Sequence, residues 1–454
     1  MQVPQLEYDV GMEVYSTKSE GIGGKIKYFI DDFVVEELLT DGTLAEVNPP
    51  TEEESPKGEG PNLICVMVKH KWDTFLAVKE VAKRMHISQK RVRFAGIKDT
   101  NALTAQHISI QNVTPEHVLG LRIRGITLYP RWYSNEKMYS ELIKGNRFHI
   151  TIRSIDYPVS VIEKNTKKVT KQIQKIGGVP NFFGHQRFGT TRPNTHLIGK
   201  YLTRNDPKRA ALEFLASPSV NEHPEARQAR QQLQNTLDFE EAQEKFPQFL
   251  LYERLMLRYL TKHPSDFVGA FRELPRRLRK LFVQAYQSYL FNRFLSERIR
   301  QGIPLDEPQM GDYAIWLDKN GLPTDKHEQV NKINIKLVEQ FMKQQKMALA
   351  LPLVGPSQPP SKGVQGELEQ KILEAEDVFR DSFKIHLMPE ATAEGKVRAV
   401  LSPVWNLVLE ELTEDEQNQG KHSLKLAFNL NRGSYATVVL REFMKPPDVI
   451  SAGY

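Results

Sequence analysis

The order in which strand-type and helix-type segments follow one another is the feature that most constrains the fold of this chain. Residues 25 to about 190 combine apolar strand-type segments with amphipathic helices. The pattern from residue 194 to about 380 is mostly helical, and strand-type segments return from about residue 395. We therefore predict a mixed α/β domain made from both ends of the chain, with an α-rich domain inserted between them.

Hydrophobic periodicity locates the expected elements within this order. Strand-type patterns cover residues 25–37, 63–69, 92–97, 107–110, 118–129, 147–153, 398–401, 423–430 and 436–440. Helical patterns cover residues 74–85, 161–176, 274–298 and 368–379. Asp73 or Thr74 can cap the first of these helices, and Gly177 with Gly178 can end the second.

Composition limits the classes of protein to which the chain can belong. With 454 residues, 40% of them hydrophobic, it can form two or three domains with substantial cores. The one cysteine, Cys65, excludes a disulfide framework and a cysteine-based zinc site, and its apolar neighbours predict a buried core residue. The net charge of +6 and the pI near 9.0 are compatible with a polyanionic partner without identifying one.

No apolar run reaches the roughly 18–20 residues of a membrane span. The first residues have neither the basic region nor the apolar region of a signal peptide. We therefore expect a cytoplasmic protein that does not insert into a membrane.

The segment from Phe94 to Gln106 places one carboxylate, Asp99, in a polar turn between two strand-type segments. Side chains at the end of a strand are held by the sheet and face solvent, which is where catalytic groups are often found. Turns also favour Asp and Asn for conformational reasons alone. These residues by themselves leave a structural hairpin and a catalytic loop equally open.

Basic residues gather on the N-terminal side of this turn. They are Lys79, Lys83, Arg84, Lys90, Arg91, Arg93 and Lys98, and a second cluster occupies residues 276–280. Cations of this kind can hold a phosphate backbone, but a solvated helix face has the same composition. The pattern favours a nucleic-acid partner only if other observations agree.

Residues 177–189 combine phenylalanines with glycines and with hydrogen-bonding side chains, among them Asn181 and Arg187. Aromatic rings beside polar groups can stack on and recognise bases. The same composition is typical of a tight turn packed by aromatic rings. Asn181 and Arg187 can therefore contact a substrate or order a loop near it.

Several catalytic templates are missing from the sequence. It contains no phosphate-binding GxxxxGK[ST] loop, no GxGxxG after a strand, no HExxH and no GxSxG elbow. The histidines, including His185 and His196, are not accompanied by cysteine or acidic partners. We expect neither a nucleotide cofactor nor a catalytic metal.

Seven segments together resemble the motifs of the tRNA pseudouridine synthases of the TruD type. They are Lys27 with DDFVVE at 31–36, KWDT at 71–74, AGIKDTNALTAQ at 95–106, GNRF at 145–148, VPNFFGHQRFG at 179–189, QSYLFN at 287–292, and GSYAT at 433–437 with LRE at 440–442. No single motif identifies the family, but the occurrence of all seven motifs in the family's order is specific for it. Residues 182–196 resemble the archaeal form. Ile30 and Asp73 depart from the Pro and Asn that the family's motifs have at these positions.

The resemblance implies a fold and a reaction. The fold is a pseudouridine-synthase-like mixed, mainly antiparallel sheet with helices, formed by residues 1–188 and 404–454, with an inserted α-rich domain over 189–403. The reaction is the isomerisation of uridine, most often uridine 13, to pseudouridine in tRNA, without a metal or an organic cofactor. The implied partner is tRNA, and a monomer is the default expectation.

The resemblance also assigns roles to individual residues. Asp99 is the essential carboxylate, acting either as a nucleophile or as the base that removes the C2′ proton. Lys27 is its charge partner, Phe148 stacks on the target base, and Asn146 orders the same strand. The further substrate-binding candidates are Asn181, Arg187, Lys83 and Arg84.

Three alternatives to uridine 13 in tRNA remain. The chain could modify another RNA position, or it could bind RNA without catalysis. A nuclease is the third alternative, but it would require paired carboxylates or a histidine pair, and the sequence offers no convincing example.

Overall fold

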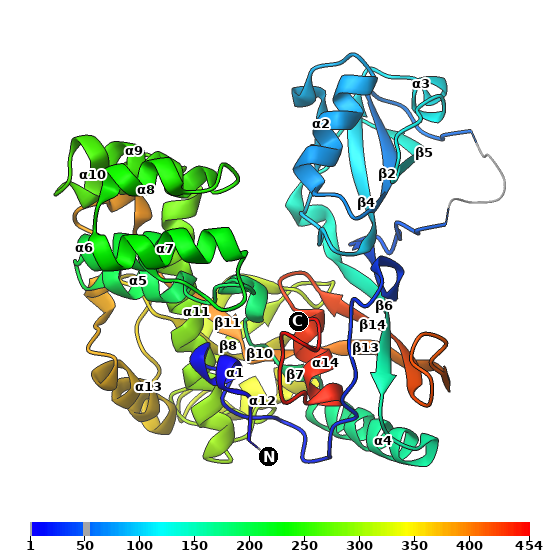
Figure 1. Ribbon diagram of the computed structural model, residues 1–454. Coiled ribbons are helices and arrows are strands. Elements are labelled where there is room, and N and C mark those ends of the chain that lie inside the picture. The colour runs from blue at the N-terminus through cyan, green and yellow to red at the C-terminus, as the bar shows by residue number, and fades with distance from the viewer. Residues whose placement is uncertain (1, 49–54) are drawn as a thin grey trace. The chain divides into compact units, whose positions relative to one another are not determined.

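The computed structural model describes residues 2–48 and 55–454, which form two compact units (Figure 1). Unit 1 comprises Met1–Ser16 and Pro180–Leu401, and unit 2 comprises Thr17–Val179 and Ser402–Tyr454. The short strands β7 (Val179–Pro180) and β12 (Leu401–Ser402) lie where the chain passes between the units. Both ends of the sequence therefore contribute to unit 2, and the first 16 residues join unit 1.

Unit 2 is built on an eight-stranded sheet. Its order is β13 (Val404–Glu414), β14 (His422–Asn431), β6 (Ile143–Ile155), β1 (Phe33–Leu39), β4 (Leu103–Gln111), β2 (Asn62–His70) and β5 (Ile126–Ser134), with β3 (Val92–Phe94) paired to β4. Only the β1–β4 pair is parallel among these strands. The prediction of a mixed fold with a mainly antiparallel sheet is confirmed.

Helices α2 (Thr74–Arg84) and α3 (Pro115–Leu119) pack on the β2–β4–β5 part of this sheet (Figure 1). The shared core includes Cys65, which is fully buried as predicted. The Asp73 carboxylate accepts a hydrogen bond from the Leu76 N–H, so the predicted N-cap of α2 is confirmed. Burial of one apolar face of α2 fixes this helix beside the loop that follows β3.

Helices α4 (Val159–Ile176) and α14 (Ala436–Met444) contact each other within unit 2. Gly177 ends α4 with a φ of 87°, in the left-handed region that glycine adopts readily. This confirms the predicted C-terminus of the helix.

One expected strand is wrong in its first part, and another is wrong throughout. The strand expected over 118–129 starts later than predicted. Residues 118 and 119 complete α3, which has a proline in its first turn. Strand β5 begins only after Gly125, which has a φ of 74°. The expected strand over 436–440 belongs to α14, all of whose residues are buried. Three consecutive β-branched residues, Thr437, Val438 and Val439, favour a strand over so short a segment, and tertiary packing overrides that preference.

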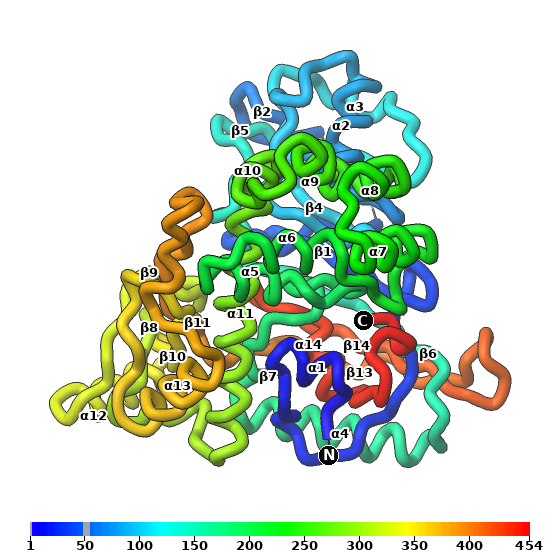
Figure 2. The backbone as a smooth tube through the Cα atoms, turned by 60° about the vertical axis from the view of Figure 1, so that its left-hand side comes forward, coloured from blue at the N-terminus to red at the C-terminus, as the bar shows by residue number. Residues whose placement is uncertain are grey.

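The middle of unit 1 consists of helices, as expected. They are α5 (Thr195–Thr203), α6 (Pro207–Ala216), α7 (Pro224–Thr236), α8 (Phe239–Lys245), α9 (Leu251–Lys262), α10 (Phe267–Arg272) and α11 (Arg276–Arg300). Helices α8 to α10 form one layer and α5 to α7 another, in both views (Figures 1 and 2). The long helix α11 packs against α5.

Unit 1 also contains a four-stranded sheet, of which the periodicity indicated only part of β11 (Lys396–Ala399). Its order is β11, β10 (Met347–Leu353), β8 (Tyr313–Leu317) and β9 (Pro323–Gln329). The remaining helices of the unit are α1 (Gln5–Asp9), α12 (Ile335–Lys343) and α13 (Gly363–Ala375). Within the described parts of the chain, no helix is long and apolar enough to cross a membrane.

Candidate active site

Asp99 lies in the loop between β3 and β4, which pair in an antiparallel hairpin with Phe94 opposite Ile108. The predicted hairpin is therefore confirmed, although its first strand ends at Phe94. The Asp99 side chain is exposed, whereas its neighbour Lys98 is buried. The loop thus presents one carboxylate to solvent from a main chain that is anchored in the unit.

Three side chains anchor the main chain of this loop. The Lys69 ammonium donates to the carbonyl oxygens of Asp99 at 2.6 Å and Lys98 at 3.4 Å. Thr74 Oγ1 accepts a hydrogen bond from the Lys98 N–H at 3.1 Å, and the Gln106 side chain donates to the Gly96 carbonyl at 2.9 Å. Contacts on both sides of Asp99 thus limit the movement of its backbone, which is the preorganisation that a catalytic group requires.

Lys98 forms a buried ion pair with Glu37, with 2.7 Å between Nζ and Oε1. The other Glu37 oxygen accepts the main-chain N–H of His107 at 2.9 Å. Burial raises the pKa of the Glu37 carboxyl, but Lys98 and His107 outweigh burial and lower it to about 2. The Lys98 side chain is therefore a structural partner inside the sheet.

The strand order brings the segments of Lys27 and Asp99 to one edge of the sheet. Strands β1 and β4 are parallel, with Val34 opposite Leu103, so both begin at the same edge. Lys27 lies just before β1, and Asp99 lies just before β4. The Lys27 ammonium lies 4.7 Å from the centre of the Phe33 ring. Its charge pairing with Asp99 stays a prediction.

A row of directly opposed residues crosses the sheet from β2 to β14. It runs from Lys69 through Thr104, Val35 and Phe148 to Phe428. Side chains in such a row point to the same face, and strands are about 4.8 Å apart, so Lys69 and Phe148 are separated by roughly 14 Å at the backbone. The anchored loop and Phe148 therefore belong to the same face of one sheet.

The Phe148 ring belongs to an aromatic cluster. It stacks on Phe428 with 5.4 Å between ring centres and lies edge-on to Phe33 at 6.4 Å. Only 6% of Phe148 is exposed, so one ring edge at most is available to a base. Two residues earlier on the same strand, the Asn146 side-chain oxygen is buried and has no hydrogen-bond partner among the described residues.

Asn181 and Arg187 belong to unit 1 and contact other residues of that unit. The Asn181 amide donates to the Ala399 carbonyl at 2.9 Å, and its oxygen accepts from Arg398 at 2.6 Å. Arg187 Nε donates to the Ser288 hydroxyl at 3.1 Å. These contacts order residues 180–188 against β11 and α11, which supports the loop-ordering role that the sequence left open.

Lys83 and Arg84 are exposed in the last turn of α2. Arg84 is paired with Glu80, one turn earlier, at 2.8 Å, and its side chain is 58% exposed. An exposed pair of this kind is weak, so the guanidinium can exchange Glu80 for a phosphate. By contrast, Arg91 of the same basic segment donates to the Gln111 and Asn112 carbonyls.

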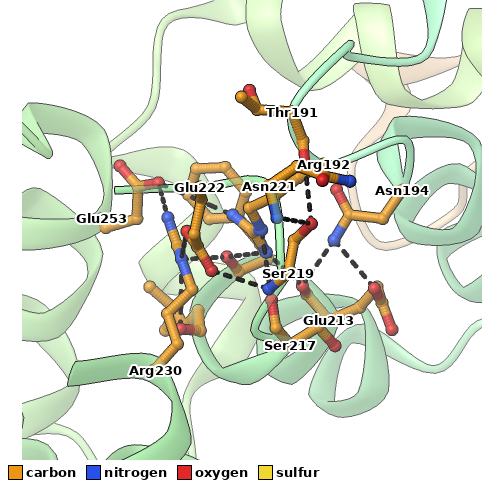
Figure 3. A network of polar contacts seen from close by, with 12 residues as sticks. Thr191, Arg192, Asn194, Glu213, Ser217, Ser219, Asn221, Glu222, Arg230 and Glu253 are labelled. Atoms are coloured by element: carbon orange, nitrogen blue, oxygen red, sulfur yellow. Dashed lines mark hydrogen bonds and ion pairs between the residues drawn. The ribbon is translucent and has the colours of Figure 1, made fainter. Parts of the chain in front are cut away.

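A second polar network lies inside unit 1 (Figure 3). Arg230 is buried and pairs with Glu222 at 3.0 Å and Glu253 at 2.6 Å. Arg192 donates to the carbonyls of Glu213 and Ser217, which fixes the loop before α5. Because these groups satisfy one another, the network is a structural element of the helical layers.

Lys69 and Glu37 are the site residues that sequence reasoning missed. Glu37 follows Glu36 within β1, and Lys69 is the penultimate residue of β2, so the available signal was a charged residue inside a largely apolar strand. In the described part of the chain, no group of three His, Cys, Asp or Glu side chains is arranged to hold a metal ion.

Comparison with known proteins finds relatives along nearly the whole chain. The profile of the family described as tRNA pseudouridine synthase D (TruD) matches residues 9–443. Proteins described as "Probable tRNA pseudouridine synthase D" in Methanococcoides burtonii and Thermococcus gammatolerans are each 37% identical to it. The first alignment covers 98% of both chains, and the second covers 94% of this chain and 96% of the relative.

A crystal structure of a TruD protein from Methanosarcina mazei is similar in fold as well as in sequence. It superposes with a TM-score of 0.85 at 37% identity, over 98% of this chain and 99% of that one. A match that spans both units and all seven motifs leaves one assignment: this chain belongs to the tRNA pseudouridine synthase D family.

Proposed function

We propose that this protein converts uridine 13 of tRNA to pseudouridine, with Asp99 as the essential carboxylate. The observation that carries the proposal is the exposed Asp99 side chain on a main chain that Lys69, Thr74 and Gln106 anchor. An ionised carboxylate held in this way can react with a nucleotide without further ordering of the loop.

The reaction is an isomerisation that needs no net oxidant or hydrolysis. The bond from C1′ to N1 breaks, the uracil turns, and a bond from C1′ to C5 forms, while C5 loses a proton and N1 gains one. Asp99 can begin this sequence as a nucleophile or as the base that removes the C2′ proton. Both routes require the ionised carboxylate at the target nucleotide.

Access to Asp99 requires that the target uridine leaves its stack in the RNA. We assign the available ring edge of Phe148, which is supported by Phe428, to an edge-to-face contact with the flipped base. The buried, unpartnered oxygen of Asn146 is a hydrogen-bond acceptor in the same part of the sheet. Lys27 precedes β1 at the edge where Asp99 also lies, and we assign it as the charge partner of Asp99.

The remaining candidates either bind the RNA backbone or order a loop of the protein. Lys83 and Arg84 hold phosphates, which position the substrate without reading its sequence. Asn181 and Arg187 order residues 180–188 through their contacts with β11 and α11. We propose that the protein works as a monomer.

The decisive experiment is base-resolved mapping of pseudouridine after the protein is incubated with unmodified tRNA. We expect modification at uridine 13 without an added cofactor. Asp99→Asn should abolish turnover and leave tRNA affinity within about twofold, since the charge is lost but the shape is kept. The matched control is Asp156→Asn, an exposed aspartate of the same unit.

Each outcome has a separate meaning. Modification at another position would refute the assignment of uridine 13 and retain the chemistry. Normal turnover by Asp99→Asn would refute the catalytic carboxylate. A tRNA pool without any pseudouridine would refute the proposed activity.

A further inference from the structure

The Lys69 side chain is fully buried and its ammonium is not paired with a carboxylate in its hydrogen bonds. It donates instead to three main-chain carbonyls, those of Trp72 at 2.7 Å, Lys98 at 3.4 Å and Asp99 at 2.6 Å. A protonated lysine has three N–H donors, so the number of donors equals the number of acceptors. The site therefore matches the charged form of this side chain in its hydrogen bonding.

Burial of a lysine is unfavourable unless its hydrogen bonds are satisfied. Lys69 is held in this position by the register of β2, where it lies opposite the uncharged residues Thr104 of β4 and Ile126 of β5. The charged groups that act on it are Asp99 and Lys98 of the loop and Asp73 at the cap of α2. Its ammonium thus joins the start of α2 to the loop that carries Asp99.

We propose that Lys69 is a positioning residue for Asp99, and that turnover requires its protonated form because only the ammonium can hold all three carbonyls. The inference rests on the proposed function, since it concerns the same carboxylate. It adds a determinant that acts through the main chain and never touches the RNA.

The protonation state of Lys69 changes close to physiological pH. Burial lowers the pKa of its amine from the ordinary 10.5 to about 8, against the opposing effect of Asp99 and Asp73. A neutral amine keeps only two donors and directs a lone pair at a carbonyl oxygen. The loop should therefore lose its fixed position as pH rises through about 8.

As pH rises, the contribution of Lys69 to folding stability increases while the activity is expected to fall. Measurements of stability and of activity can therefore tell these two effects apart. A lysine whose pKa is lower in the folded state than in the unfolded state destabilises the fold below its folded pKa. Its contribution to stability then rises with pH, between about 8 and 10.5. A loss of activity in this window cannot be caused by unfolding through Lys69.

The test is the rate of pseudouridine formation in single turnover, measured from about pH 6.5 to 9.5 with enzyme in excess over tRNA. In the wild type we expect the rate to fall with a midpoint near pH 8. Lys69→Met, which keeps the length of the side chain without donors, should lower the rate at pH 7 by about 100-fold. It should also abolish the dependence on pH and leave tRNA affinity unchanged.

Two further variants complete the design. Lys69→Arg keeps its charge throughout this pH range and should restore part of the rate and move the fall beyond pH 9.5. Lys167→Met is the matched control, because this lysine is 63% exposed on α4, and it should keep the wild-type rate and profile.

The inference is overturned if the wild-type rate is constant between pH 7 and 9, or if Lys69→Met keeps the fall near pH 8. If Lys69→Met does not fold, the pH profiles of the wild type and of Lys69→Arg provide the test. A constant wild-type rate between pH 7 and 9, or a fall near pH 8 that persists in Lys69→Arg, then overturns the inference. Failure of the proposed function is distinct, since the wild type would then form no pseudouridine at any pH.

Discussion

Two lysines lie near Asp99: Lys98 precedes it in the sequence, and Lys69 contacts its carbonyl oxygen. The two lysines differ in function because they differ in their partners. Lys98 is neutralised by Glu37 at 2.7 Å inside the sheet. Lys69 donates to carbonyls, and one of them is that of Asp99 itself. The first lysine stabilises the sheet beneath the loop, and the second orients the loop.

Glu37→Gln should destabilise the protein strongly, because it leaves the buried Lys98 ammonium without its counter-charge. The expected loss is about 3–5 kcal/mol of unfolding free energy at pH 7, measured by urea denaturation. The control, Glu163→Gln, removes a half-exposed partner on α4 and should cost about 0.5 kcal/mol or less. A loss of under about 1 kcal/mol for Glu37→Gln would contradict the role of this ion pair.

The same variant gives a defined pH dependence. The pKa of Glu37 is about 2 in the folded state, below its ordinary value of 4.5, so its stabilising contribution is complete above pH 4.5. That contribution disappears as pH falls toward 2. The difference in stability between wild type and Glu37→Gln should therefore narrow in this acidic range and remain constant between about pH 5 and 7.

At the scale of elements, the parallel pairing of β1 with β4 decides where the candidate residues lie. It places the start of both strands at one edge and sets Val35 between Thr104 and Phe148. The segment before β1 and the loop before β4 then lie at this edge. Helix α2 buries its apolar face on the adjacent strands and leaves Lys83 and Arg84 exposed.

The helical layers of unit 1, like the sheet beneath the Asp99 loop, contain a buried ion pair that we expect to stabilise them. Arg230→Met should leave the largely buried Glu222 side chain without its ion-pair partner and leave Glu253 with Arg192 alone, at 4.0 Å. We expect a loss of about 3–5 kcal/mol in the stability of unit 1. Faster amide exchange in α6, α7 and α9, with unchanged exchange in the sheet of unit 2, would locate the effect.

The control for this experiment is Arg227→Met, an exposed arginine on the same helix. It should leave the exchange rates of all helices unchanged. Equal effects of the two variants would mean that the buried network does not stabilise these layers.

At the scale of the whole molecule, the net charge of +6 is small, so binding of RNA should depend on local basic segments. Lys83→Ala should weaken binding equally for all tRNAs. The slope of log affinity against log salt should fall by about one. Filter binding between about 50 and 200 mM salt measures this slope.

Lys167→Ala serves as the control because it removes the same charge from α4, outside the basic segment. It should leave the slope unchanged. An identical decrease for both variants would indicate a diffuse effect of net charge rather than a phosphate contact at Lys83.

Sequence patterns predicted the elements that have a clear start or end signal. The cap at Asp73, the end of α4 at Gly177 and the hairpin around Asp99 are examples. The patterns did not predict α14, which is buried on every side, or strands β8, β9 and β10 of the sheet of unit 1.

The sequence by itself determined the family, through seven motifs in order, and it singled out Asp99, because both kinds of information lie in the identity and spacing of nearby residues. Only the tertiary structure decided what surrounds that carboxylate. Lys69 and Asp99 are 30 residues apart, and Glu37 and His107 are 70 apart. Such contacts depend on which strands pair and in which register, and no local pattern encodes that choice.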